Sequence, residues 1–183
     1  MSRQKIAIIP GDPSGIGPEL VAKLLHDDHV QQSADILLVG DAHLWQRGAA
    51  QAEIKLALRS IASDQLAEFS GCAHLDLQTI SHDDIKIAEV TKAGGTTALR
   101  CLDKAMDLAV NGLVDGILFA PFNKAAMTAA GLNAEDEHRY MARYLGHAGY
   151  HSEINVLDNL MTCLLYTSPS PRDLSTSRMP SSA

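Results

Sequence analysis

Residues 5–25 constrain the fold of this chain more than any other segment. The isoleucine-rich run 5–9 is followed by a glycine- and proline-rich turn, and an apolar-faced stretch begins at Pro18. A short continuous apolar run is typical of a strand buried in a parallel sheet. Proline is tolerated in a first helical turn, and Glu19 suits the positive end of a helix. The segment therefore predicts a strand, a tight loop and a helix.

The same alternation continues along the chain. Further strands are predicted at residues 35–40, 54–58, 74–80, 114–120 and 154–157, and helices at 42–52, 94–110, 124–130 and 135–145. Strands that alternate with helices are typical of a parallel sheet with helices on both faces. The pattern predicts an α/β fold.

Charge and cysteine content narrow the classes of partner. The 183 residues carry a net charge of −7, and no apolar run approaches the roughly 20 residues of a membrane span. Nucleic acids and anionic membranes need a basic face, so we expect neither as a partner. Cys72, Cys101 and Cys163 have the spacing of neither a disulfide framework nor a zinc site. We expect a cytoplasmic protein.

Composition changes after Thr162. Residues 163–183 contain three of the seven prolines of the chain and six serines. A disordered tail is one interpretation. We prefer another, because residues 163–173 and 177–183 back-translate in one frame to sequences that resemble two parts of a sequencing adapter. We therefore predict that residues 1–162 are the natural part of the chain and that 163–183 are a non-native tail.

The turn after the first strand is the first candidate site. Backbone N–H groups of a glycine-rich loop at a helix start can bind an anion, so Gly11, Asp12, Gly15 and Gly17 are candidate ligand contacts. Their spacing is neither the dinucleotide fingerprint nor a P-loop, and a plain tight turn is the alternative. Asp41 follows the second strand and could bind ribose hydroxyls, but we expect it to cap the next helix.

Two further motifs carry side chains that could bind a phosphate or a carboxylate. Asn123 and Lys124 follow a predicted buried strand, and ligands gather at the carboxyl ends of such strands. His138 and Arg139 follow an acidic helix start. A helix cap, a solvated lysine and charges that complement a helix dipole are the alternatives. The other histidines, His74 among them, are expected at the surface, without the spacing of a metal site.

Together these motifs resemble the PdxA family, 4-hydroxythreonine-4-phosphate dehydrogenase and its relatives. Residues 6–25 (IAIIPGDPSGIGPELVAKLL) are similar to the first strand, loop and helix of the family, and residues 114–132 (VDGILFAPFNKAAMTAAGL) to a later strand and its Pro-x-Asn-Lys motif. The resemblance covers residues 5–162, about the amino-terminal half of a family member. It implies a truncated α/β/α domain of the isocitrate and isopropylmalate dehydrogenase type.

The resemblance also implies an activity. Family members use NAD and a divalent metal (Zn, Mg or Co) to oxidise a phosphorylated hydroxy acid such as 4-phosphohydroxythreonine, with or without decarboxylation, in pyridoxal phosphate biosynthesis or a related sugar-acid pathway. They are homodimers. The resemblance implies substrate contacts at Asn123, Lys124 and His138, and it places the metal ligands after Thr162.

The chain departs from the family in one motif. Where the family has Gly-His-Thr, this sequence has Glu137-His138-Arg139, which suggests a different acid substrate. Two other functions remain open, a non-catalytic anion-binding α/β module and an enzyme similar to phosphate acetyltransferases. The chain as given is expected to be inactive and of poor stability, because an unfinished sheet leaves apolar surface uncovered.

Overall fold

The computed structural model describes residues 3–134, 136–149, 151–157 and 160–165, and the chain divides into two compact units, Met1–Glu137 and His138–Ala183. In chain order the elements are β1 (Gln4–Ile9), α1 (Gly17–Leu25), α2 (Asp28–Ser33), β2 (Ala34–Val39), α3 (Ala42–Gln51), η1 (Ser63–Gln65), β3 (Cys72–Leu75), η2 (His82–Asp84), α4 (Lys92–Val110), β4 (Gly116–Phe119), α5 (Lys124–Ala129), α6 (Glu137–Tyr144), β5 (Ser152–Leu157) and β6 (Leu160–Leu165). These elements confirm the predicted α/β class.

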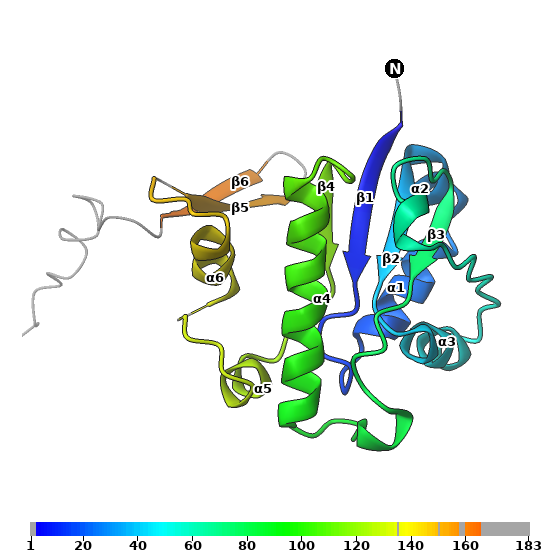
Figure 1. The fold of residues 1–183 in the computed structure, drawn as a ribbon, viewed down its shortest axis with the longest axis horizontal. Helices are drawn as coiled ribbons and strands as arrows, with labels where there is room; N and C mark the ends of the chain where they lie inside the picture. Colours follow the sequence, from blue (N-terminus) through cyan, green and yellow to red (C-terminus); the bar gives the residue numbers. More distant parts are fainter. Residues whose placement is uncertain (1–2, 135, 150, 158–159, 166–183) are drawn as a thin grey trace, which may run out of the picture. The chain divides into compact units, whose positions relative to one another are not determined.

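The first unit is built on a four-stranded parallel sheet in the order β3-β2-β1-β4. Ile8 of β1 is paired with Leu38 of β2 on one side and with Leu118 of β4 on the other. Helices α1 and α3 cover one face, where Ile8 and Leu38 pack with Val21 and Trp45. Helix α4 lies along the opposite face (Figure 1). Both faces of the central strands are therefore buried, as their continuous apolar runs predict.

Most predicted elements of this unit are confirmed, but two strands differ. Residues 54–58 form no strand, although Leu56 and Leu58 pack against the core. Their alternation reflects this packing, and backbone pairing with β3 begins later, where His74 N–H donates to the carbonyl of Arg59. The strand predicted at 74–80 ends at Leu75, because the chain then turns with Gln78 at a φ of 52°.

One helix boundary differs from the prediction, and one helix was not predicted. Helix α4 begins at Lys92, two residues before Gly94, because the hydroxyl of Thr91 caps it by accepting the N–H of Gly94 at 3.0 Å. Helix α2 was not predicted. Its first turn is fixed by Asp27, whose carboxylate accepts the N–H of His29 at 2.8 Å. An aspartate before a short helix is a usual N-cap, so the sequence did carry this indication.

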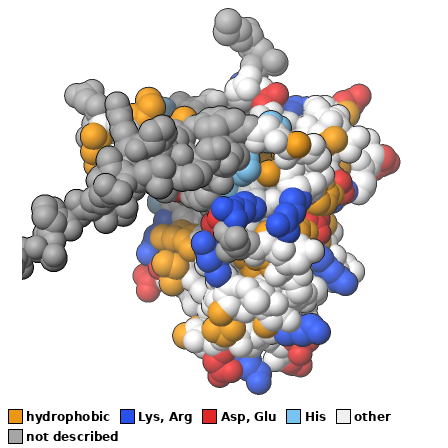
Figure 2. Space-filling model, turned by 90° about the vertical axis from the view of Figure 1, so that its left-hand side faces the viewer, with side chains coloured by type: hydrophobic (Ala, Val, Ile, Leu, Met, Phe, Trp, Pro, Cys, Tyr) orange, Lys and Arg blue, Asp and Glu red, His pale blue; other side chains and the backbone are white. Residues whose placement is uncertain are grey.

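The second unit contains helix α6 from His138 onward and an antiparallel pair, β5 and β6. Helix α6 is described from Glu137, and residue 135, where its start was predicted, lies outside the described residues. Strand β6 extends past the boundary predicted at Thr162. The tail predicted at 163–183 lies outside the described residues from 166 onward. Among the described residues, none of the helices has both the length and the apolar content that a membrane crossing requires. On the face drawn in Figure 2, acidic and basic side chains are interspersed.

Candidate functional site

The glycine turn and the Pro-x-Asn-Lys motif lie against each other in the first unit. Their strands, β1 and β4, are paired neighbours, so the loops that follow them leave the same edge of the sheet. Asp12 N–H donates to the carbonyl of Pro121 at 3.0 Å. Gly11 has a φ of 68°, and a Cβ built on it would lie 2.4 Å from the carbonyl oxygens of both Ala120 and Pro121. Two motifs 110 residues apart thus form one backbone junction.

The two loops of this junction lead to helices on opposite faces of the sheet. The loop after β1 leads to α1 on one face, and the loop after β4 leads to α5, which packs with α4 of the opposite face. In open α/β sheets, ligands bind in the crevice outside the carboxyl ends of two such strands. The position of the junction therefore makes it the leading candidate site.

Some of the polar groups in the glycine turn are hydrogen-bonded to one another. Asp12 is buried, its carboxylate accepts the N–H of Ser14 at 2.9 Å, and its carbonyl accepts the N–H of Gly15 at 3.1 Å. The start of α1 receives no cap from the side chain of Ile16. The first N–H groups of a helix have no partner within it, so those of α1 can take an anionic group.

Arg47 supports this turn from another element. It extends from α3, and its Nη2 donates to the carbonyl of Pro13. Burial lowers the pKa of the Arg47 guanidinium, and the nearby carboxylate of Asp12 opposes that change. A guanidinium remains protonated at neutral pH in proteins. Arg47 therefore places a positive charge beside the buried carboxylate of Asp12.

The Pro-x-Asn-Lys motif forms the start of α5. The side chain of Asn123 accepts the N–H of Ala126 at 3.2 Å, so Asn123 caps α5, which is one of the two roles that the sequence left open. Nζ of Lys124 lies 3.9 Å from Oε2 of Glu137. Helix α5 is held close to α4 at Gly95, where a Cβ would lie 1.9 Å from the carbonyl oxygen of Ala126. The absence of a side chain at Gly95 thus determines how close Asn123 and Lys124 come to α4.

The predicted residues His138 and Arg139 belong to the second unit. Nε2 of His138 lies 3.8 Å from a carboxylate oxygen of Glu153 on β5. This pair is an ion pair when the imidazole is protonated. The first unit brings together the four glycine-turn candidates and the start of the Pro-x-Asn-Lys motif, and the second unit contains His138 and Arg139.

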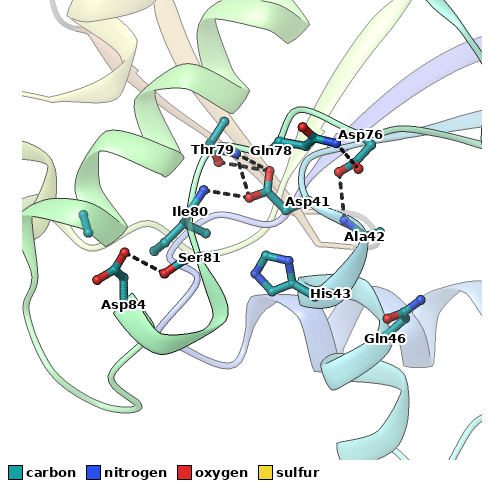
Figure 3. A pocket seen from close by; sticks show the side chains of 11 residues that line it. Asp41, Ala42, His43, Gln46, Asp76, Gln78, Thr79, Ile80, Ser81 and Asp84 are labelled. Carbon is teal, nitrogen blue, oxygen red and sulfur yellow. Dashed lines mark hydrogen bonds between the residues drawn. The ribbon is translucent and has the colours of Figure 1, made fainter.

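A cavity of about 510 Å³, lined mostly by residues with polar side chains, opens at the ends of β2 and β3 (Figure 3). Asp41 is buried at its wall, and its carboxylate accepts the N–H groups of Thr79 and Ile80, each at 2.8 Å. The predicted cap at Asp41 is wrong, because this carboxylate holds the loop after β3. Asp76 accepts the N–H of Ala42 at 3.1 Å in its place. This cavity could not be predicted from local pattern, because its wall depends on the contact between loops that are distant in the chain.

Histidine and cysteine positions bear on the metal prediction. His74 is buried, contrary to the surface position expected, and one ring nitrogen lies 2.7 Å from the carbonyl oxygen of Gly40. Burial raises the pKa of the Cys101 thiol, and the carboxylate of Asp41 adds to that rise. Within the described ranges, no group of three or more His, Cys, Asp or Glu side chains is arranged to hold a metal ion.

Comparisons with known proteins identify the family. The profile of the family described as "Pyridoxal phosphate biosynthetic protein PdxA" matches residues 32–173. A Pseudomonas aeruginosa protein provisionally named 4-hydroxythreonine-4-phosphate dehydrogenase 2 is 36% identical over 163 residues, which are 88% of this chain and 48% of that protein. A Clostridium botulinum protein provisionally named D-threonate 4-phosphate dehydrogenase is 28% identical over 159 residues, 86% of this chain and 45% of its own.

A solved structure agrees with these relatives. The crystal structure of a 4-hydroxythreonine-4-phosphate dehydrogenase from Burkholderia phymatum matches with a TM-score of 0.78 and 27% identity, over 89% of this chain and 49% of that one. The chain thus spans about half the length of the curated relatives it matches. The profile match covers most of the 183 residues, including the strand and the Pro-x-Asn-Lys motif that pack on the glycine turn, and it shows that this chain belongs to the PdxA family.

Proposed function

We propose that this chain is part of an NAD-dependent dehydrogenase that oxidises a phosphorylated hydroxy acid. The observation that carries the proposal is the junction of the glycine turn with the Pro-x-Asn-Lys motif, at the point of the sheet where ligands bind. The names of the relatives supply two candidate substrates. One is the amino-acid phosphate 4-phosphohydroxythreonine, and the other is the sugar-acid phosphate threonate 4-phosphate.

In the proposed reaction, the residues of this chain bind the cofactor and the substrate and orient them. The uncapped N–H groups at the start of α1 attract an anionic group of cofactor or substrate. Gly17 lets the start of α1 pack against the end of β1, because a Cβ there would lie 2.0 Å from the carbonyl oxygen of Pro10. Lys124 supplies a cation for a phosphate or carboxylate. NAD, when bound, supplies the hydride acceptor.

The described residues offer no set of three or more His, Cys, Asp or Glu side chains that fits a divalent cation. The uncapped start of α1 does fit an anionic group of a cofactor.

NAD reduction at 340 nm tests the proposal. Because the chain spans about half the length of its relatives, the assay uses the complete reading frame that contains it, with each candidate substrate and with Zn²⁺, Mg²⁺ or Co²⁺. We expect turnover of at least one of the two substrates. Lys124→Met should lower kcat/KM by roughly 10- to 100-fold, as for the loss of a charged hydrogen bond. Absence of turnover with both substrates would overturn the proposed function.

A further inference from the structure

Arg47 is a charged side chain that contacts the glycine turn from another helix. Its guanidinium is partly buried, and Nη2 donates to the carbonyl of Pro13. That carbonyl and the N–H of Ser14 belong to one peptide group, the 13–14 peptide. The N–H of this peptide donates to Oδ1 of Asp12 at 2.9 Å. A cation and a carboxylate therefore hold the two ends of the same peptide group.

The packing of α3 on α1 brings Arg47 to the turn. A Cβ on Gly48 would lie 2.3 Å from the carbonyl oxygen of Pro18 in the first turn of α1, so a side chain at Gly48 would push the two helices apart. The neighbouring Arg47 reaches Pro13 across this contact, 34 residues away in the chain. The position of the guanidinium is thus set by the fold of the first unit.

The carboxylate of Asp12 lies inside the turn. The residue is buried, and a Cβ on Gly15 would lie 3.8 Å from its Oδ2. A negative charge at this place repels an anion that approaches the start of α1. Burial lowers the pKa of the Arg47 guanidinium, and the carboxylate of Asp12 opposes that change. The same attraction means that Arg47 reduces the repulsion between Asp12 and an anionic ligand.

Stability of the fold does not explain an arginine at this position. Nε of Arg47 is buried, and no described residue accepts a hydrogen bond from it. A charged group that is buried with an unmet donor lowers the free energy of unfolding. We propose that Arg47 is a positioning residue of the candidate site: it fixes the 13–14 peptide and neutralises Asp12, so that the turn can accept a phosphate group of a ligand. This inference rests on the proposed function.

A purely structural role for Arg47 makes a different prediction. If Arg47 only held the turn in place, a second change at Asp12 could not repair its loss. If Arg47 neutralises Asp12, removal of the carboxylate charge should repair most of the loss. Asparagine suits this test, because its side-chain oxygen can still accept the N–H of Ser14 and it carries no charge.

The experiment measures calorimetric binding of NAD and of threonate 4-phosphate, each by itself, to the complete reading frame that contains this chain. The proteins compared are wild type, Arg47→Met, the double variant with Asp12→Asn, and the control Arg59→Met. Arg59 is a matched control, because its Nη2 also donates to a backbone carbonyl, that of Ser70 at 2.6 Å, outside the candidate site.

We expect Arg47→Met to raise the Kd of at least one of the two ligands by roughly 10- to 100-fold. The ligand affected identifies whether the phosphate on the turn belongs to the cofactor or to the substrate. The double variant should return to within about fivefold of wild type, and the control should stay within about twofold. An unchanged Kd in Arg47→Met, or a double variant that binds no better than Arg47→Met, would overturn the inference.

Asp12→Asn alone keeps the inference testable if Arg47→Met does not fold. The charge of Arg47 is then uncompensated, so at least one of the two ligands should bind roughly 3- to 10-fold more tightly. Unchanged or weaker binding of both ligands to this variant would contradict the proposed role of Arg47.

Binding and turnover together separate this inference from the proposed function. If the ligands bind with the expected pattern but no substrate is oxidised, the inference holds and the proposed function fails. If wild type is active and Arg47→Met binds both ligands as wild type does, the inference alone fails. If wild type binds neither ligand, both fail.

Discussion

Gly11 combines two demands that no other residue type meets. Its φ of 68° disfavours a side chain, and the carbonyls of Ala120 and Pro121 occupy the position of a Cβ at 2.4 Å. Gly71 has the same φ of 68° with nothing within 4 Å of its Cβ position. The two glycines therefore separate the cost of backbone strain from the cost of steric overlap.

We predict that Gly11→Ala lowers the free energy of unfolding by at least about 3 kcal/mol, and Gly71→Ala by about 1–2 kcal/mol. The second figure is the cost of a left-handed L-residue, and the first adds an overlap with backbone that cannot turn away. Urea denaturation followed by circular dichroism measures both. Equal losses would show that the loops after β1 and β4 are not in contact.

Burial of Cys101 makes the stability of the fold depend on pH. The thiol is buried on α4 and its pKa is raised above the ordinary value of 9.0, first by burial and then by the carboxylate of Asp41. Above pH 9 the unfolded chain releases this proton and the folded chain retains it. The stability that the neutral thiol contributes is therefore present below pH 9 and is lost as the pH rises above it.

We predict that wild type loses about 1 kcal/mol more stability than Cys101→Ala between pH 7.5 and pH 9.5, because each pH unit above the unfolded pKa costs about 1.4 kcal/mol. Urea titrations of both proteins at the two pH values give the difference. Parallel losses in the two proteins would mean that the Cys101 thiol ionises as readily in the folded chain as in the unfolded one.

At the scale of elements, local pattern predicts strands and helices well where each element buries a full face. Residues 6–9 of β1 and 36–39 of β2 are all apolar because both faces of these strands are covered. Residues 54–58 alternate because only one of their sides is covered, and they pair with no neighbouring strand. Hydropathy records burial and not backbone pairing, so the prediction of a strand there was wrong.

The contacts of the candidate site likewise differ in whether they could be predicted from local sequence. The Asn123 cap could be predicted because it depends on residues three positions apart. The partners of Asp41 could not, because Thr79 and Ile80 reach it through the folding of a separate loop. The contact between Gly11 and Pro121 likewise depends on the strand order, and a sequence that alternates strands and helices is compatible with several orders.

The close packing of helices α4 and α5 depends on the absence of a single side chain. A Cβ at Gly95 would lie 1.9 Å from the carbonyl oxygen of Ala126, whereas one at Gly94 would lie 3.0 Å from the rotatable hydroxyl of Thr91. We predict that Gly95→Ala lowers the free energy of unfolding by about 2–3 kcal/mol and increases amide exchange in α5. Gly94→Ala should change stability by less than about 1 kcal/mol, since alanine also favours the helix. Similar effects of the two changes would place α5 farther from α4.

At the scale of the whole molecule, the two units differ in how much apolar surface they bury. Three of the six residues of β1 and five of the six of β2 are buried, whereas Ile154, Val156 and Leu157 of β5 are 54–70% exposed. Helix α6 contains no buried residue. A two-stranded sheet without a buried face is marginally stable in water. The described part of the second unit therefore lacks the contacts that make unfolding cooperative.

Hydrogen exchange measured by mass spectrometry on the 183-residue chain tests this difference. We predict that amides of β5 exchange at least about 100-fold faster than those of β2, because β5 can open locally while β2 exchanges through unfolding of the sheet. Peptides from β2 serve as the internal control in the same sample. Equal protection of β5 and β2 would require a surface that covers Ile154 and Val156 in solution, and it would make the two units one cooperative structure.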